Sequence, residues 1–168
     1  MRKLLSIMVL AGCALMFCAC SHEEEQPVTA ELYGKWTQVN DADQTIVTTM
    51  EFSHGKLVNY GPTYTAVNQT IPGDADSYTI NTVTYSQLTP TPVASQYIRE
   101  QGYYTISVSN DRNILPLWPQ WRWISPDGSS WAVDATEPSW METYTYVLDN
   151  PNVLVVNSMN NTKRTFLK

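Results

Sequence analysis

The chain has very little cysteine, and none of it lies where a folded domain is expected. Its 168 residues include three cysteines, at positions 13, 18 and 20. Residues 21–168 therefore cannot form a disulfide and must be stabilised by a hydrophobic core alone. That stretch is long enough for one domain with a substantial core and too short for two.

Histidine is also scarce. The chain has two histidines, His22 and His54, which we expect in a polar tether and in a hairpin turn. No cysteine follows residue 20, and the sequence has no Gly-x-Ser-x-Gly elbow. We therefore expect no catalytic residues and no enzymatic activity.

The carboxylates form no recognisable catalytic or metal-binding motif. Asp-Ala-Asp occurs at residues 41–43 and again at 74–76, but neither copy has the further oxygen ligands of a Ca²⁺ loop. Glu100, Asp134 and Glu142 could supply a carboxylate pair for glycoside hydrolysis. Their spacing in the sequence does not give the separation in space which that chemistry needs. We expect no metal site and no cofactor.

Positive charge is in deficit. The chain has 10 Lys and Arg against 16 Asp and Glu. Arg2 and Lys3 precede the expected mature domain, which then carries a net charge of about −8. An acidic surface argues against nucleic acid as a partner and against docking on anionic lipid headgroups.

Only one long apolar run is present, at the N-terminus. Residues 4–19 are uncharged and mostly apolar, and Arg2 and Lys3 precede them. Sixteen residues of helix span ~24 Å, short of the ~30 Å hydrocarbon core of a bilayer. A charged start followed by a short apolar stretch is typical of a secretory signal peptide.

The end of this run resembles a lipobox, the cleavage motif of bacterial lipoproteins. Residues 17–20 read Phe-Cys-Ala-Cys, and the resemblance implies that Cys20 is acylated and becomes the new N-terminus. Residues 10–13 read Leu-Ala-Gly-Cys and match the general motif better by letters. We favour Cys20, because cleavage at Cys13 would leave an apolar tail and an apolar region of only seven residues. The signal peptide is then residues 1–19.

Three glutamates at 23–25 follow the expected lipid anchor. This acidic run resembles the lipoprotein export signal of Bacteroidetes, which implies a protein anchored by lipid in the outer membrane and facing the cell surface. The alternative is that the glutamates begin a solvated linker and the protein faces the periplasm. Residues 20–31 are expected to be an acidic tether, and two or more acyl chains would anchor it stably.

From residue 32 onward the chain alternates in period 2 between turn signals. Strands are expected at 46–52, 77–85, 102–109, 143–148 and 164–167, and residues 86–96 are expected to form a loop or an edge because Pro90 and Pro92 lie there. No segment keeps a helical period over three turns. The pattern predicts an all-β domain, a single antiparallel meander closing into a barrel, with a β-sandwich as the alternative.

Residues 32–36, Leu-Tyr-Gly-Lys-Trp, resemble the Gly-x-Trp signature of lipocalins and of the lipocalin-like domains of Bacteroidetes lipoproteins. The resemblance implies an eight-stranded barrel closed at one end by Trp36, with Gly34 allowing a tight entry. It also implies a basic residue of the last strand over the indole, and Arg164 is the candidate. The second lipocalin motif and the helix after the barrel are missing. The domain is expected to span residues 32–168.

Tryptophan and proline are concentrated at residues 114–140, which we expect to be a long insertion carrying five of the six tryptophans. Trp121 and Trp123 would point the same way on an extended backbone and could form a platform for sugar rings. Trp131 or Trp140 could supply a second wall. The alternative is that these side chains cap an open barrel end.

Together these features predict a non-catalytic envelope lipoprotein whose barrel binds a small apolar or amphipathic ligand. One alternative is a surface glycan-binding module that uses the tryptophans. Another is an accessory subunit of an outer-membrane complex, with a protein partner. The residues expected to line or fill the barrel are Ile46, Met50, Tyr104, Ile106, Val108, Tyr144 and Tyr146.

Overall fold

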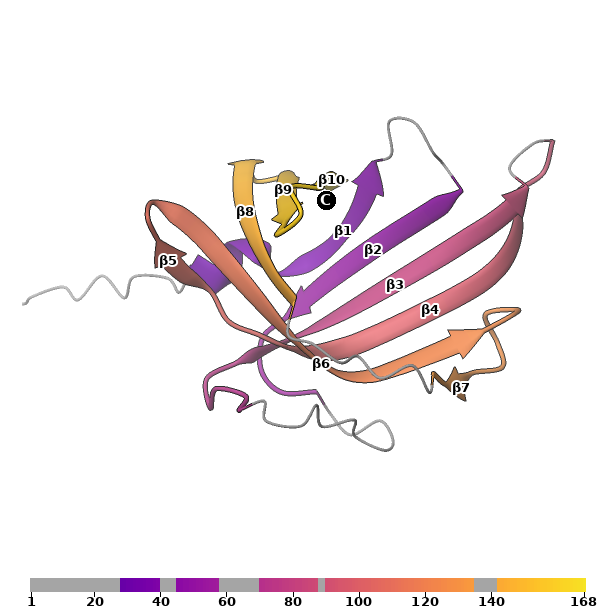
Figure 1. Cartoon of the computed structure of the whole chain (residues 1–168), viewed down its shortest axis with the longest axis horizontal. Coiled ribbons are helices and arrows are strands. Elements are labelled where there is room, and N and C mark those ends of the chain that lie inside the picture. The colour runs from indigo at the N-terminus through magenta and orange to yellow at the C-terminus, as the bar shows by residue number, and fades with distance from the viewer. Residues whose placement is uncertain (1–27, 40–44, 58–69, 88–89, 135–141) are drawn as a thin grey trace, which may run out of the picture.

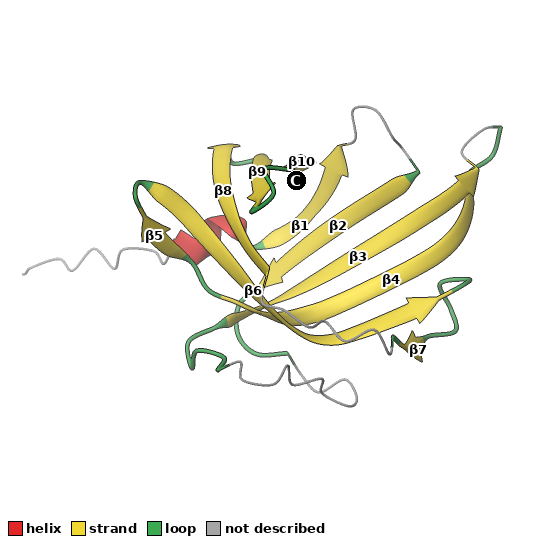
Figure 2. Cartoon of the chain, in the orientation of Figure 1, coloured by secondary structure: helices red, strands yellow, loops and turns green. Residues whose placement is uncertain are grey.

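The computed structural model describes residues 28–39, 45–57, 70–87, 90–134 and 142–168. The described chain is almost entirely β-structure (Figures 1 and 2). A short 3-10 helix, η1 (Val28–Leu32), precedes ten strands. The strands are β1 (Gly34–Val39), β2 (Ile46–Ser53), β3 (Asp76–Gln87), β4 (Val93–Tyr104), β5 (Ser107–Ser109), β6 (Arg112–Ser125), β7 (Ala132–Val133), β8 (Glu142–Asn150), β9 (Val153–Ser158) and β10 (Lys163–Leu167). Among the described residues, no helix is long and apolar enough to cross a membrane.

Eight of the strands form a closed antiparallel barrel. β1 pairs with β2, β2 with β3, and β3 with β4. β6 pairs with both β4 and β8, and β8, β9 and β10 lead back to β1. β5 and β7 pair only with β6 and lie off the barrel path. The all-β meander closing into a lipocalin-like barrel is therefore confirmed, and the β-sandwich alternative is wrong.

One end of the barrel is filled with large side chains. Strand residues alternate between the two faces of the wall, so Met50 and Phe52 are buried while Glu51 between them is exposed. The rings of Phe52 and Tyr104 meet edge to face, with centroids 5.0 Å apart. The buried core cluster is Leu32, Trp36, Met50, Phe52, Tyr78, Tyr104, Leu115, Leu117, Tyr146, Leu154, Val156 and Phe166. Burial of each large apolar side chain contributes about 1.5–3 kcal/mol.

Gly34 and Trp36 close this end at the start of β1. Trp36 is fully buried, and its Nε1 donates a 2.7 Å hydrogen bond to the carbonyl oxygen of Leu32. Gly34 has φ +114°, a conformation that L side chains rarely adopt, and a Cβ there would lie 2.9 Å from Cε of Lys168. The Nζ of Lys168 lies 4.9 Å from the centroid of the indole.

Lys168, and not Arg164, is thus the basic residue over Trp36, so the expected role of Arg164 is wrong. The reason is the register of β1 and β10. The two strands are antiparallel and Thr37 pairs with Leu167, so a residue earlier on β1 lies opposite a residue later on β10. Continued by one residue, this register brings Lys168 opposite Trp36. Arg164 is four residues away, or ~13 Å along the strand, toward the other end of the barrel.

A polar cluster ties the chain together beside the closed end. The buried carboxylate of Asp76 accepts a 2.7 Å hydrogen bond from the hydroxyl of Tyr33 and a 2.8 Å bond from the backbone N–H of Gly55. The Nδ1 of His54, whose side chain is 82% exposed, lies 3.0 Å from the same carboxylate. The carboxylate links the start of β1, the end of β2 and the start of β3.

The expected insertion at 114–140 is wrong in its first half, because residues 112–125 form the barrel strand β6. Pro119 lies at a β-bulge opposite Gly102, where the ladder is interrupted. A Cβ on Gly102 would lie 2.1 Å from the carbonyl oxygen of Trp118, so this close approach requires glycine. Pro116 lies between Ile114, which pairs with β5, and Leu117, which pairs with β4.

Two other expected boundaries also differ. β3 runs to Gln87 and β4 begins at Val93, so residues 86–87 and 93–96 of the expected loop or edge belong to paired barrel strands. The strand expected at 102–109 is broken, because residues 105 and 106 lie between β4 and β5. Val108 consequently leaves the inner face of the barrel and is 64% exposed.

Candidate functional site

A cavity of about 640 Å³ occupies the barrel lumen at the end opposite Trp36. Seven of the eight barrel strands contribute to its wall, all except β9, which places it inside the barrel. This end of the barrel, where β2 and β4 begin and β3 ends, lies on the right of Figure 1. The lining residues are Gln38, Ile46, Thr48, Ile80, Thr82, Ile98, Glu100, Arg122, Glu142, Tyr144 and Arg164.

On β2 and β3, inward side chains become smaller from the filled end of the lumen toward the hollow end. On β2 the inward positions run from Phe52 and Met50 in the core to Thr48 and Ile46 at the cavity. On β3 they run from Tyr78 to Ile80 and Thr82. An eight-stranded barrel has room for its own side chains or for one small ligand. Here side chains fill one end, and the other end has a cavity.

Glu100 stands at the boundary between core and cavity. Its Oε1 accepts a 2.9 Å hydrogen bond from the hydroxyl of Tyr78. Burial raises the pKa of the Glu100 carboxyl, the hydrogen bond from Tyr78 opposes this, and the negative charge of Glu142 raises the pKa further. The positive charge of Arg122 acts in the opposite direction.

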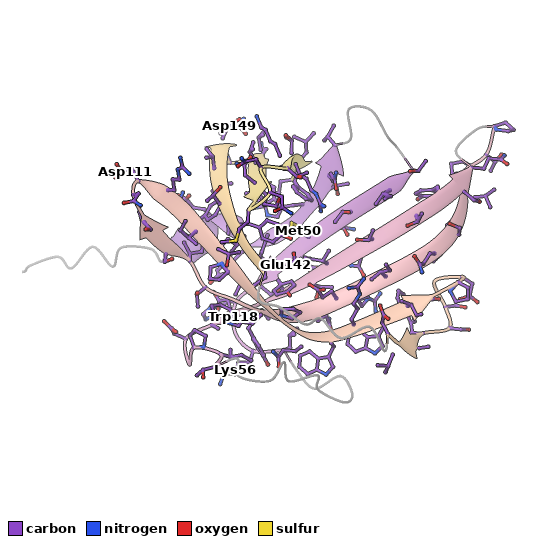
Figure 3. The ribbon with its side chains drawn as sticks, viewed as in Figure 1. Met50, Lys56, Asp111, Trp118, Glu142 and Asp149 are labelled. Atoms are coloured by element: carbon purple, nitrogen blue, oxygen red, sulfur yellow. The ribbon has the colours of Figure 1, made fainter. Side chains whose placement is uncertain are left out.

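A second carboxylate, Glu142, lies at the start of β8 (Figure 3). It accepts a hydrogen bond from the hydroxyl of Tyr144. Burial, followed by this hydrogen bond, raises the pKa of the Tyr144 hydroxyl well above its usual range. Both lumen carboxylates are therefore held by tyrosine hydroxyls from the barrel wall.

Two guanidinium groups also line the cavity. The Nε of Arg122 lies 3.0 Å from the carboxylate of the buried Asp134, whose backbone N–H also donates a 2.9 Å hydrogen bond to the carbonyl oxygen of Arg122. Arg164 is exposed and lines the cavity from β10. With isoleucines on β2, β3 and β4, the wall combines apolar surface, carboxylates and guanidinium groups.

The three tyrosines named from the sequence lie in two different places. Tyr144 lines the cavity, whereas Tyr104 and Tyr146 are buried in the core. Among the described residues, the hydroxyls of Tyr104 and Tyr146 have no hydrogen-bond partner. Burial and the negative charge of Glu31 raise the pKa of Tyr146 to about 12.

The other lining candidates divide in the same way. Met50 belongs to the core, Ile46 lines the cavity, and Ile106 packs against the core from outside it. Cys20 and Trp140 lie outside the described residues, as do the signal peptide, the three glutamates and the Asp-Ala-Asp copy at 41–43.

Trp121 and Trp123 do not form an exposed platform together. Trp121 is 4% exposed and its ring packs near that of Tyr103, with centroids 6.5 Å apart. Trp123 is half-buried, and the structure brings it together with Trp131 in a second pocket, of about 460 Å³, lined also by Arg99 and Gln101.

Sequence reasoning missed the lumen role of Glu100 and Glu142, which were considered only as a catalytic pair. A signal was present in each case. Glu100 is an even number of residues from Ile98 and Tyr104 and so shares their face of β4. Glu142 likewise shares the face of Tyr144 on β8. Charged residues at inward positions of a barrel strand indicate a polar lumen. In the described part of the chain, no group of three or more His, Cys, Asp or Glu residues could hold a metal ion.

The fold and this site define a class, a closed eight-stranded barrel of lipocalin-like architecture with one packed and one hollow end. Comparison with protein-family models, with curated proteins and with solved structures finds no match for this chain.

Proposed function

We propose that this protein is a cell-envelope lipoprotein whose barrel binds one small amphipathic ligand in its lumen without catalysis. The observation that carries the proposal is the cavity of about 640 Å³ inside the closed barrel wall. Its volume falls within the ~300–1,000 Å³ that is common for small-molecule sites.

The lining favours an amphipathic ligand over a purely apolar one. Ile46, Ile80 and Ile98 offer apolar surface for a chain or ring. Glu100 and Arg164, on the same cavity wall, offer hydrogen bonds and charge to a polar group. An entirely apolar ligand would desolvate these charged groups without replacing their bonds to water, which is costly.

The sequence supports the envelope location. The apolar run at 4–19, the lipobox-like residues 17–20 and the three glutamates at 23–25 together favour lipid attachment at Cys20 and display on the outer membrane. Mass spectrometry of the protein extracted from membranes should find the lipid on Cys20. An acylated Cys13 would contradict this part of the proposal.

Ligand binding is tested with the chain lacking residues 1–20. Native mass spectra before and after organic extraction should show a co-purifying small molecule that extraction removes. The fluorescent amphiphile 8-anilinonaphthalene-1-sulfonate, added to the extracted protein, should bind at one site. Thr82→Trp places an indole in the cavity and should abolish that binding, because Thr82 lines the wall.

The matched control is Val147→Trp, which adds the same side chain at an exposed position of β8. It should bind the probe as the parent does, and both variants should keep the circular dichroism of the parent. Equal binding by Thr82→Trp and Val147→Trp would refute the lumen as the site.

A further inference from the structure

The second pocket lies on the outside of the barrel, over β4, β6 and β7, which run side by side at the lower right of Figure 1. Arg99 and Gln101 flank Glu100 on β4, so they point away from the lumen that Glu100 lines. The outer pocket is therefore separate from the lumen cavity, although both share the same strands.

Two indoles form the apolar walls of this pocket. Trp123 pairs in register with Arg99 across β6 and β4. Trp131 approaches from the segment before β7, and the Cζ of Arg99 lies 4.5 Å from the centroid of its ring. Both tryptophans are half-buried, so a face or an edge of each remains open to a ligand.

The turn that carries Trp131 is held by a network of short-range hydrogen bonds. The carboxylate of Asp127 accepts bonds of 2.8 and 2.9 Å from the backbone N–H groups of Ser129 and Ser130. The hydroxyl oxygen of Ser125 accepts a 2.8 Å bond from the N–H of Gly128. The bonds from Ser130 and Ser129 hold the pKa of the exposed Asp127 carboxyl well below its usual range, and the whole network fixes the approach of the second indole.

The polar groups of the pocket are also fixed. The Nε of Arg99 donates a 2.9 Å hydrogen bond to Oδ1 of Asn81, and Nε2 of Gln101 donates a 3.0 Å bond to Oγ1 of Thr79. Both acceptors lie on β3. The remaining guanidinium N–H groups of Arg99 and the amide oxygen of Gln101 are left for a ligand, as donors and as an acceptor.

We propose that this outer pocket binds a pyranose ring of a glycan, with mostly equatorial hydroxyls as in glucose. The axial C–H groups of such a ring form a flat apolar face that packs on an indole, while its rim of hydroxyls both donates and accepts hydrogen bonds. The two indoles match the first property, and the fixed Arg99 and Gln101 match the second. An acyl chain would satisfy only the indoles.

The experiment measures binding of four glucose-based or glucosamine-based probes, the hexasaccharides of cellulose, laminarin, amylose and chitin, to the mature protein. Isothermal titration calorimetry should show at least one that binds with a 1:1 ratio. Trp131→Ala should weaken that binding at least ~10-fold, because it removes one indole wall. Gln101→Ala retains both indoles and should also weaken it.

The matched control is Val147→Ala, an exposed position on β8, which should leave sugar binding unchanged. The lumen-filling variant Thr82→Trp should also bind sugar normally, so a failure of lumen binding and a failure of sugar binding are distinguishable. Circular dichroism confirms that each variant is folded.

Three results would overturn the proposal. The first is that none of the four probes binds at millimolar concentration. The second is that Trp131→Ala and Gln101→Ala bind sugar as the parent does. The third is that vesicles of phosphatidylethanolamine and phosphatidylglycerol, rather than sugars, bind in a manner that depends on Trp131. The pocket would then be a membrane contact.

Discussion

Replacing Gly34 by alanine should strongly destabilise the barrel, by an amount that the local geometry sets. A residue with a Cβ at φ +114° lies in a sparsely populated region of backbone space, which costs ~1–3 kcal/mol. The new Cβ would also lie 2.9 Å from Cε of Lys168 and displace that side chain from the ring of Trp36. The lost cation–π contact adds ~0.5–1 kcal/mol, so the expected loss is about 1.5–4 kcal/mol.

Urea unfolding of the chain lacking residues 1–20 measures this loss. With a slope of ~1–3 kcal/mol per molar urea, a loss of ~3 kcal/mol lowers the midpoint by ~1–3 M. Lys168→Ala alone should cost only ~0.5–1 kcal/mol, and Gly34→Ala in that background should still cost ~1–3 kcal/mol, because the backbone strain remains.

The matched control is Gly73→Ala. Gly73 lies outside the positive-φ region and a Cβ there would have no heavy atom within 4 Å. This substitution should be neutral or stabilise by up to ~1 kcal/mol. If Gly34→Ala and Gly73→Ala had equal midpoints, the argument that the barrel end requires a glycine at residue 34 would be refuted.

Two further predictions concern carboxylates. Asp76→Ala should destabilise by ~2–4 kcal/mol in urea unfolding, because it removes the buried carboxylate that accepts the hydrogen bonds of Tyr33 and Gly55. His54→Ala, at an exposed position, should cost less than ~1 kcal/mol, and equal costs would contradict this assignment. Burial raises the folded-state pKa of Glu100 above its ordinary 4.5, so the folded state binds this proton more tightly than the unfolded state does. The free energy of unfolding should therefore fall as pH rises from about 4.5 through the folded pKa. Glu100→Gln should remove this part of the pH dependence. Parallel curves of unfolding free energy for the parent and Glu100→Gln between about pH 4 and 8 would refute this prediction.

The barrel was predictable because its strongest signals are local. Alternation on β2 and β8 depends on residues two apart, and the turn between β8 and β9 is marked by Asn150 and Pro151. The Gly-x-Trp residues likewise indicated how β1 begins. The wall strand β6 was missed, since Pro116 and Pro119 argue against a central strand by any local rule. Only pairing with β4 across a bulge makes Pro119 acceptable, and that pairing is not visible in the sequence.

The site was less predictable, because it depends on which strands meet. Parity identified Ile46, Tyr144 and Tyr146 as inward, but it did not indicate that Tyr146 fills the packed end while the other two line the hollow one. The choice between Arg164 and Lys168 depended on the register of the first and last strands. The partnership of Trp123 with Trp131 depends on a turn that brings the chain back beside β6.

Closure of the wall has a consequence for how copies of this protein behave at high local density. A sheet edge offers unpaired N–H and C=O groups to which a strand of another chain can add. Within the described residues, the strands with a single partner are β5, of three residues, and β7, of two. Such short edges give an incoming strand few bonds to gain. Crowded copies should therefore meet through their side chains and remain individually folded, without growing into a shared sheet.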